Sequence, residues 1–197
     1  MLIVGLTGGI ATGKSTVAAM LRRRGARVVD ADALVHGAER PGQPAYNDIV
    51  RRFGGGVLAP DGSIDRAALG KLVFDDAGAR RDLEAITHPR VRELIAQEVA
   101  AAAAAGDEVA IIDIPLLFET GRADQFSGVL LVYAPPDVQV QRLRERSGLS
   151  EDEARKRLAA QLSIDEKRQR ATWVIDNSGA LSATEEAVAR WWDEISS

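Results

Sequence analysis

Five short apolar runs alternate along the chain with segments of helical periodicity. The runs are Leu2–Leu6, Arg27–Asp30, Glu108–Asp113, Val129–Tyr133 and Trp173–Asp176. Short apolar runs bounded by glycine, proline or acidic residues are typical of buried strands. After the first run, Val17, Met20 and Leu21 recur at helical spacing until Gly25 ends the pattern. This alternation predicts an α/β fold whose strands form a parallel sheet.

The segment from Pro41 to Ala105 breaks the alternation, because its periodicity is helical throughout. Pro44 fits the first turn of one helix, and Asp65 can cap a second. A third runs toward His88, and Pro89 is expected to begin a further helix. A doubly wound fold normally has one helix between strands, so the sequence predicts an inserted helical region.

The C-terminal part contains three pairs of serine and glutamate at the spacing of a helix-capping box. These pairs are Ser150 with Glu153, Ser163 with Glu166, and Ser182 with Glu185. Basic residues are frequent between Arg142 and Arg170, and bulky apolar ones are few. We therefore expect a mobile, arginine-rich lid there, with a pair of solvated charged helices as the alternative. Trp191 and Trp192 have the spacing of core residues on the last helix.

The turn after the first strand carries the pattern G-x-x-x-x-G-K-[ST] at residues 8–15. A strand before it and a helix after it are the context that a phosphate-binding loop requires. Its backbone N–H groups would bind phosphate oxygens, Lys14 would reach the β- and γ-phosphates of ATP, and Ser15 would offer its hydroxyl to Mg²⁺. A glycine-rich turn without a ligand is the alternative. The ATP-binding residues predicted here are Gly9, Ile10, Ala11, Thr12, Gly13, Lys14, Ser15 and Thr16.

Polar residues also stand at the ends of three later strands, where open α/β sheets bind their ligands. Asp32 follows the second strand and is a candidate site residue or, equally, a helix cap. Asp113 ends the third strand and resembles an acid that holds magnesium directly or through water. Asn177 follows the fifth strand and is a candidate contact for the base or ribose. The apolar segment 114–119 predicts either a wall of the substrate cleft or a plain core loop.

Composition and charge narrow the class of protein. A chain of 197 residues with 46% hydrophobic residues can form one globular domain with a core. A formal net charge of −4 disfavours a nucleic-acid-binding protein. The lack of cysteine excludes disulfides and thiolate zinc sites. The sequence shows neither a signal-peptide layout nor a membrane-spanning run, so we expect a cytoplasmic protein without a membrane partner. The oligomeric state is not determined, and we expect a monomer.

These motifs together resemble the dephospho-CoA kinase family over nearly the whole chain. The resemblance rests on residues 6–10, 13–16, 29–32, 88–89, 113–119 and 174–177. It implies a P-loop NTPase-type three-layer sandwich with a five-stranded parallel sheet, an inserted helical substrate domain and a helical lid. The implied parts are a core of residues 1–32, 107–141 and 172–197, an insertion at 33–106 and a lid at 142–171.

The resemblance also implies an activity, which is the ATP-dependent phosphorylation of the ribose 3′-hydroxyl of dephospho-CoA. Asp32 would then be the base at that hydroxyl, and Arg142 would face the phosphates together with Lys14. The substrate-binding residues implied are Thr7, Asp32, His88, Pro115 and Leu116. From spacing alone, a helix-entry position is favoured for His88 over a ligand contact. Ala11 and Thr12 stand where the family leads us to expect Gly-Ser, and we expect neither to need a side-chain contact.

Two other functions fit the same residues. Another small-molecule kinase, acting on a nucleoside monophosphate or a sugar acid, would use the same P-loop and lid. A regulatory protein that binds ATP and turns it over slowly would need only the P-loop. A switch GTPase is disfavoured, because the chain lacks the Asn-Lys-x-Asp signature that reads guanine.

Overall fold

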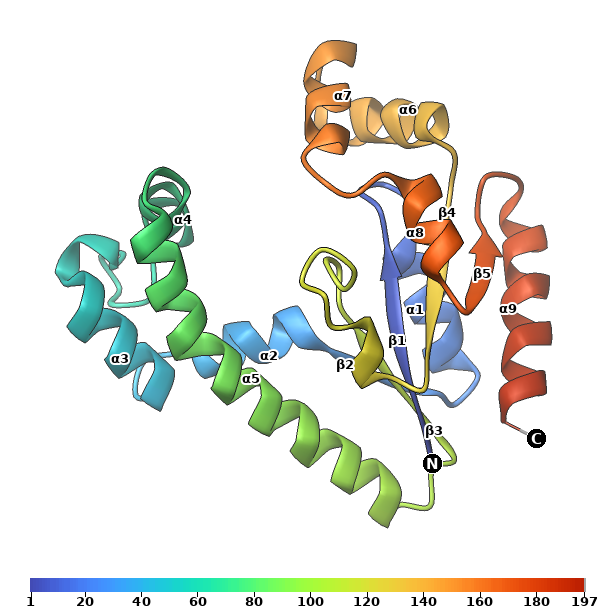
Figure 1. The fold of residues 1–197 in the computed structure, drawn as a ribbon, viewed down its shortest axis with the longest axis horizontal. Coiled ribbons are helices and arrows are strands. Elements are labelled where there is room, and N and C mark those ends of the chain that lie inside the picture. The colour runs from blue at the N-terminus through green and yellow to red at the C-terminus, as the bar shows by residue number, and fades with distance from the viewer. Residues whose placement is uncertain (197) are drawn as a thin grey trace. The chain divides into compact units, whose positions relative to one another are not determined.

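A computed structural model describes residues 1–196 and contains one five-stranded sheet (Figure 1). The strands are β1 (Leu2–Gly8), β2 (Arg27–Asp30), β3 (Val109–Asp113), β4 (Gly128–Tyr133) and β5 (Trp173–Asp176). Their order in the sheet is β2-β3-β1-β4-β5, and the β1–β3, β1–β4 and β4–β5 pairs are parallel. The predicted fold class is confirmed.

The helices follow the predicted pattern except at Ser182, at Pro89 and at the start of the helix after β2. Their bounds are α1 (Lys14–Arg23), α2 (Ala31–Ala38), α3 (Pro44–Phe53), α4 (Arg66–Asp75), α5 (Ala77–Ala104), α6 (Pro136–Ser147), α7 (Glu151–Ala159), α8 (Ile164–Arg170) and α9 (Leu181–Ile195), with short 3₁₀ turns η1 (Gly55–Val57) and η2 (Ala123–Gln125). The capping boxes at Ser150 and Ser163 form. The one predicted at Ser182 does not, because α9 already begins at Leu181 and Ser182 lies inside its first turn.

The second difference concerns Pro89, which lies inside the continuous helix α5 instead of beginning a new one. A proline inside a helix leaves the carbonyl four residues earlier without its N–H partner. That carbonyl belongs to Ala85, which is exposed, so water can take the place of the missing donor. The 28 residues of α5 thus include both helices that the sequence suggested.

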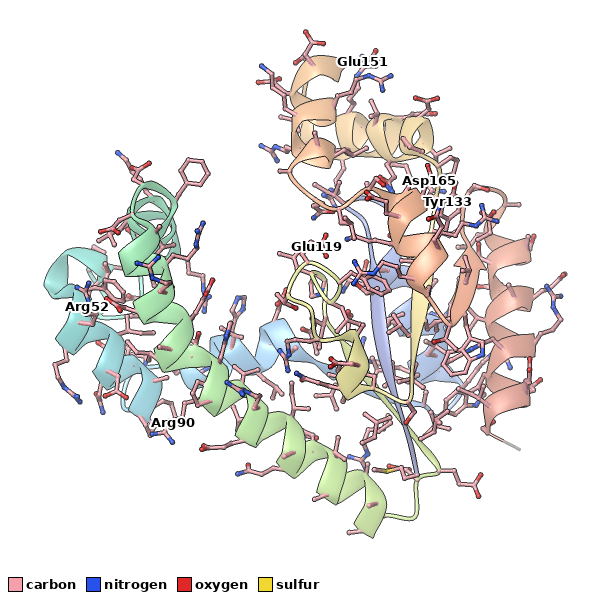
Figure 2. The ribbon with its side chains drawn as sticks, in the orientation of Figure 1. Arg52, Arg90, Glu119, Tyr133, Glu151 and Asp165 are labelled. Atoms are coloured by element: carbon pink, nitrogen blue, oxygen red, sulfur yellow. The ribbon has the colours of Figure 1, made fainter. Side chains whose placement is uncertain are left out.

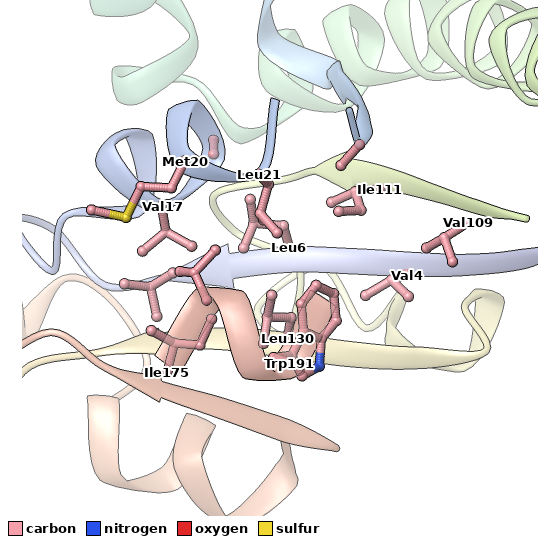
Figure 3. Close-up of a cluster of buried hydrophobic side chains, with 14 residues drawn as sticks. Val4, Leu6, Val17, Met20, Leu21, Val109, Ile111, Leu130, Ile175 and Trp191 are labelled. Carbon is pink, nitrogen blue, oxygen red and sulfur yellow. The ribbon is translucent and has the colours of Figure 1, made fainter. Parts of the chain in front are cut away.

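The sheet has helices on both faces, as the alternation of side chains along β4 shows. Leu130 and Val132 belong to a cluster with α1 and α9, in which Trp191 of α9 is buried as predicted (Figure 3). Leu131 and Tyr133 point to the other face and pack with Ile164 of α8. Neighbouring residues of a strand face opposite sides, so these contacts define three layers.

The chain divides into two compact units, which are Met1–Val29 with Ala101–Ser197 and, separately, Asp30–Ala100. The second unit has its own small core of Ile49, Val57, Ile64 and Leu69. The assignment of residues 33–106 to substrate binding and of 142–171 to a lid stays a prediction. Across residues 1–196, none of the helices combines the length and the hydropathy needed to cross a bilayer.

Glu39, at the end of α2, is a buried acid in the second unit, and its residue is 7% exposed. Burial raises the pKa of its carboxyl above the ordinary value, although Arg66 and His36 act in the opposite direction. Arg66 Nη1 lies 2.9 Å from Glu39 Oε2, but the pair is not aligned as a hydrogen bond. The buried charge is therefore only partly compensated.

This raised pKa predicts a pH-dependent stability. The carboxyl of Glu39 has a higher pKa in the folded state than in the unfolded state, so its protonated form stabilises the fold below about pH 4.5. This contribution is lost as the pH rises through the folded-state pKa. We expect Glu39→Gln to unfold at a higher temperature than the parent at pH 7.5, with the difference shrinking toward pH 4.5. Thermal unfolding of both proteins over this range checks it. A variant that is less stable at pH 7.5 would show that the Arg66 pair outweighs burial.

Candidate nucleotide site

The loop of residues 8–15 connects β1 to α1, and its backbone is shaped by two residues with positive φ. Gly13 has φ 89°, and a Cβ there would lie 2.1 Å from Asn177 Nδ2, so no larger residue fits. Ala11 has φ 59° and is the one residue other than glycine with positive φ in the described part of the chain. This conformation costs an L-residue with a Cβ about 1 to 2 kcal/mol.

The side chains of Ala11 and Thr12 both make contacts within the protein, and the expectation that neither position needs a side-chain contact stays a prediction. The Thr12 hydroxyl donates to the Gly9 carbonyl at 2.9 Å, and Thr12 is fully buried. Ala11 packs against the cluster formed by Val140, Leu143 and Ala154. The bond within the loop thus holds Thr12, and the contacts with α6 and α7 hold Ala11.

The loop presents a group of unused backbone donors. Within residues 1–196, the N–H groups of Ala11, Gly13, Lys14 and Ser15 donate to no protein acceptor. The last of these belong to the first turn of α1, where the helix dipole adds a partial positive charge. Free N–H groups at a helix N-terminus after a glycine-rich loop form a binding site for phosphate. This is the chemistry that the motif predicted.

Lys14 forms an ion pair with Asp113, the last residue of β3. Strand β1, which leads into the loop before Lys14, is a neighbour of β3 in the sheet, and Leu6 of β1 is in register with Asp113. Asp113 is 5% exposed, and 20% of the Lys14 side chain is exposed. A lysine and an acid therefore meet beside the donors of the loop.

The residues predicted to hold magnesium carry oxygen donors, which suit this ion. Ser15 is exposed, and its hydroxyl has no protein partner among the described residues. Asp113 supplies a carboxylate at the end of β3. The described residues contain no group of three or more His, Cys, Asp or Glu side chains that could hold a metal on their own. Two protein oxygens fit an ion that takes its other ligands from phosphates and water.

Asn177 is buried and braces the loop from the C-terminal side. Its Nδ2 donates to the Thr12 carbonyl at 2.7 Å, and its Oδ1 accepts from the Thr184 hydroxyl at 2.8 Å. Arg142, on α6, donates from Nη2 to the Asn177 carbonyl at 2.8 Å. Both residues thus reach the loop region, and the base or ribose contact expected of Asn177 stays a prediction.

The substrate residues predicted in the first unit are joined by one hydrogen bond. The Thr7 hydroxyl, at the end of β1, donates to the Pro115 carbonyl at 3.1 Å. The segment 114–119 is both core loop and surface, because Leu117 and Phe118 are buried while Leu116 is 42% exposed. Leu116 is therefore available to a ligand, whereas Thr7 holds the segment in place.

Asp32 and His88 belong to the second unit. Asp32 lies exposed in the first turn of α2 and is not its cap, since the Asp30 carboxylate accepts the Ala33 N–H at 3.0 Å. The capping alternative for Asp32 is therefore wrong, because α2 begins two residues earlier than its apolar pattern. His88 is exposed inside α5, and the expectation of a helix-entry position is wrong as well.

Besides the apolar contacts of Ala11, two side chains of the segment 142–171 hydrogen-bond to the loop, and sequence reasoning missed both. Gln161 Oε1 accepts the Ile10 N–H at 3.0 Å, and Lys167 Nζ donates to the Gly8 carbonyl at 3.2 Å. Lys167 also forms an ion pair with Glu119 at 2.6 Å. The sequence contains a signal for the burial of Lys167. Ile164, Lys167 and Ala171 have the spacing of one helical face, and Ile164 and Ala171 are apolar.

Comparisons with known proteins identify the family of the chain. The dephospho-CoA kinase family model matches residues 2–183. A dephospho-CoA kinase of Anaeromyxobacter dehalogenans is 57% identical over 93% of this chain and 87% of its own length. The crystal structure of TT1252 from Thermus thermophilus superposes with a TM-score of 0.85 at 41% identity, covering 100% and 98% of the two chains. Dephospho-CoA kinase from Campylobacter jejuni gives a TM-score of 0.75 at 28% identity over 98% and 96%. The chain belongs to the dephospho-CoA kinase family.

Proposed function

We propose that this protein transfers the γ-phosphate of ATP to the ribose 3′-hydroxyl of dephospho-CoA, giving coenzyme A and ADP. The observation that carries the proposal is the set of unpartnered N–H groups beside Lys14, in a chain of the dephospho-CoA kinase family. ATP is the phosphate donor, and dephospho-CoA is the small-molecule partner. We infer a cytoplasmic monomer without a nucleic-acid or membrane partner.

The phosphates of ATP bind the loop 9–16 and the N-terminus of α1. Lys14 leaves Asp113 to reach the β- and γ-phosphates, where its charge offsets the negative charge of the transferring group. Ser15 would hold magnesium through its hydroxyl, and Asp113 would hold it through water. When bound, magnesium neutralises charge on the β- and γ-phosphates. Arg142 adds a second cation, since its guanidinium has donors beyond the one used on Asn177.

Asp32 accepts the proton of the 3′-hydroxyl as that oxygen bonds to the γ-phosphorus and the bond from phosphorus to the β,γ-bridging oxygen breaks. Little covalent chemistry is left for the protein, so positioning and electrostatics supply most of the rate. Thr7, His88, Pro115 and Leu116 bind dephospho-CoA, with Thr7 acting through the segment it holds.

A panel of phosphate acceptors tests this function. The purified protein is incubated with ATP, magnesium and one of dephospho-CoA, a nucleoside monophosphate or gluconate, and ADP formation is measured. We expect turnover with dephospho-CoA to exceed the others by orders of magnitude. A preference for gluconate or a nucleoside monophosphate would assign another small-molecule kinase. ATP binding without acceptor-dependent turnover would assign a regulatory protein.

Arg142→Ala should lower kcat about 10²-fold and change KM for ATP much less, because the guanidinium meets charge that develops during transfer. Steady-state kinetics at saturating dephospho-CoA measures both constants. Arg144→Ala is the matched control, since Arg144 lies on the same helix and is paired with Glu151 at 3.7 Å. An unchanged kcat with a raised KM would limit Arg142 to ground-state binding.

A further inference from the structure

Lys167 is a fully buried lysine that the proposed mechanism does not use. It lies on α8 with 0% of its side chain exposed. Its ammonium has two partners, the Gly8 carbonyl at 3.2 Å and Glu119 Oε1 at 2.6 Å. Glu119, labelled in Figure 2, is the last residue of the segment 114–119. Its Oε1 also accepts the Leu162 N–H at 3.2 Å. One buried charge thus connects three stretches that are far apart in sequence.

A contribution to the stability of the fold does not by itself explain the buried charge of Lys167. Removing a lysine from water is costly, and the attraction to its acid often only balances that cost. Glu119 is itself 21% exposed, so water screens part of the pair. The position of α8 is secured independently, since Ile164 packs with Leu131 and Tyr133 of β4. The geometry at Gly8 offers a more specific reason.

Gly8 is the last residue of β1, and its carbonyl begins the phosphate-binding loop. In a planar trans peptide, the carbonyl and the following N–H point in opposite directions. Holding the Gly8 carbonyl toward Lys167 therefore turns the Gly9 N–H away from α8. The next N–H, of Ile10, is held by Gln161. Together, Lys167 and Gln161 fix the first two peptide planes of the loop.

We propose that Lys167 is a positioning residue for nucleotide binding, which rests on the proposed function of the loop. Its ammonium orients the Gly8 peptide, so the N–H groups at Ala11, Gly13, Lys14 and Ser15 are arranged before phosphate binds. Glu119 supplies the counter-charge and plays no part in the loop. Preorganised donors bind a ligand more tightly because less conformational freedom is lost on binding.

The test compares Lys167→Met with Glu119→Gln by calorimetric titration of the whole protein with ADP and, separately, with dephospho-CoA. Methionine keeps most of the volume and removes the bond to Gly8. Glutamine removes the counter-charge and keeps an acceptor for Lys167. We expect Lys167→Met to weaken ADP binding about tenfold or more and to leave dephospho-CoA binding within twofold. Glu119→Gln should bind ADP as the parent does.

Three results would overturn the proposal. They are ADP binding within twofold of the parent in folded Lys167→Met, an equal loss for both ligands, and a loss in Glu119→Gln as large as in Lys167→Met. Should Lys167→Met not fold, the double variant with Glu119→Gln leaves no unpaired charge and is measured in its place. A parent that binds ADP but neither binds nor phosphorylates dephospho-CoA would contradict the proposed function and leave this inference standing.

Discussion

Lys14→Met should lower the rate of phosphate transfer by more than about 10³-fold, the scale on which a cation at the transferring phosphoryl group contributes. The side chain is replaced by one of similar length without charge, so the cation proposed to meet the β- and γ-phosphates is lost. Steady-state turnover with ATP and dephospho-CoA measures the loss. Because the N–H donors of the loop remain, ADP should still bind.

The structure adds a complication that the sequence did not show, because Lys14 is not a free surface lysine. It is paired with Asp113, and removing it leaves a carboxylate that is 5% exposed without this cation. Breaking a buried pair from one side is strongly destabilising. We therefore expect Lys14→Met to unfold at a lower temperature than the parent.

The double variant Lys14→Met/Asp113→Asn separates stability from catalysis. Neutralising Asp113 should recover most of the lost unfolding temperature and none of the lost activity. If turnover recovered along with the unfolding temperature, the loss of activity in Lys14→Met would be a consequence of its lower stability. Near-normal turnover in the single variant would contradict the phosphate-binding role of the loop.

The parts of the site that the sequence predicted are those made by local backbone. The loop needs only residues 8–15 and the helix that follows, so a motif with its flanking pattern was sufficient. The sheet was predictable for a similar reason, since buried strands are apolar throughout. Residues at strand ends, such as Asp113, could be placed at one edge of the sheet by topology alone.

Contacts that join distant segments were not predictable. Lys167 and Gly8 are 159 residues apart, and the order of strands that brings α8 over β4 is absent from any local pattern. The sequence pattern places Lys167 among the charged residues of a lid, because a lysine is almost never fully buried. The predictions of helix boundaries were wrong for a different reason. Pro89 and Ser182 obey local rules that the surrounding helices override.

Asp32→Asn should lower turnover with dephospho-CoA roughly 10² to 10⁴-fold, the usual contribution of a general base. Asparagine keeps the size of the side chain and cannot accept the hydroxyl proton. The change should cost little stability, because Asp32 is exposed and Asp30 caps the helix. The lost charge in the first turn of α2 is worth about 0.3 to 1 kcal/mol.

Asp30→Asn is the matched control, since it removes the same charge from the same end of α2 and asparagine still caps a helix. We expect it to keep parental turnover, while ATP binding is unchanged in both variants. Magnesium is the remaining variable, because a nearby carboxylate can also order the waters of the metal. Raising magnesium should therefore not restore Asp32→Asn. Rescue by the metal would place Asp32 in the metal's water shell. Turnover within a few-fold of the parent would show that the hydroxyl needs no side-chain base.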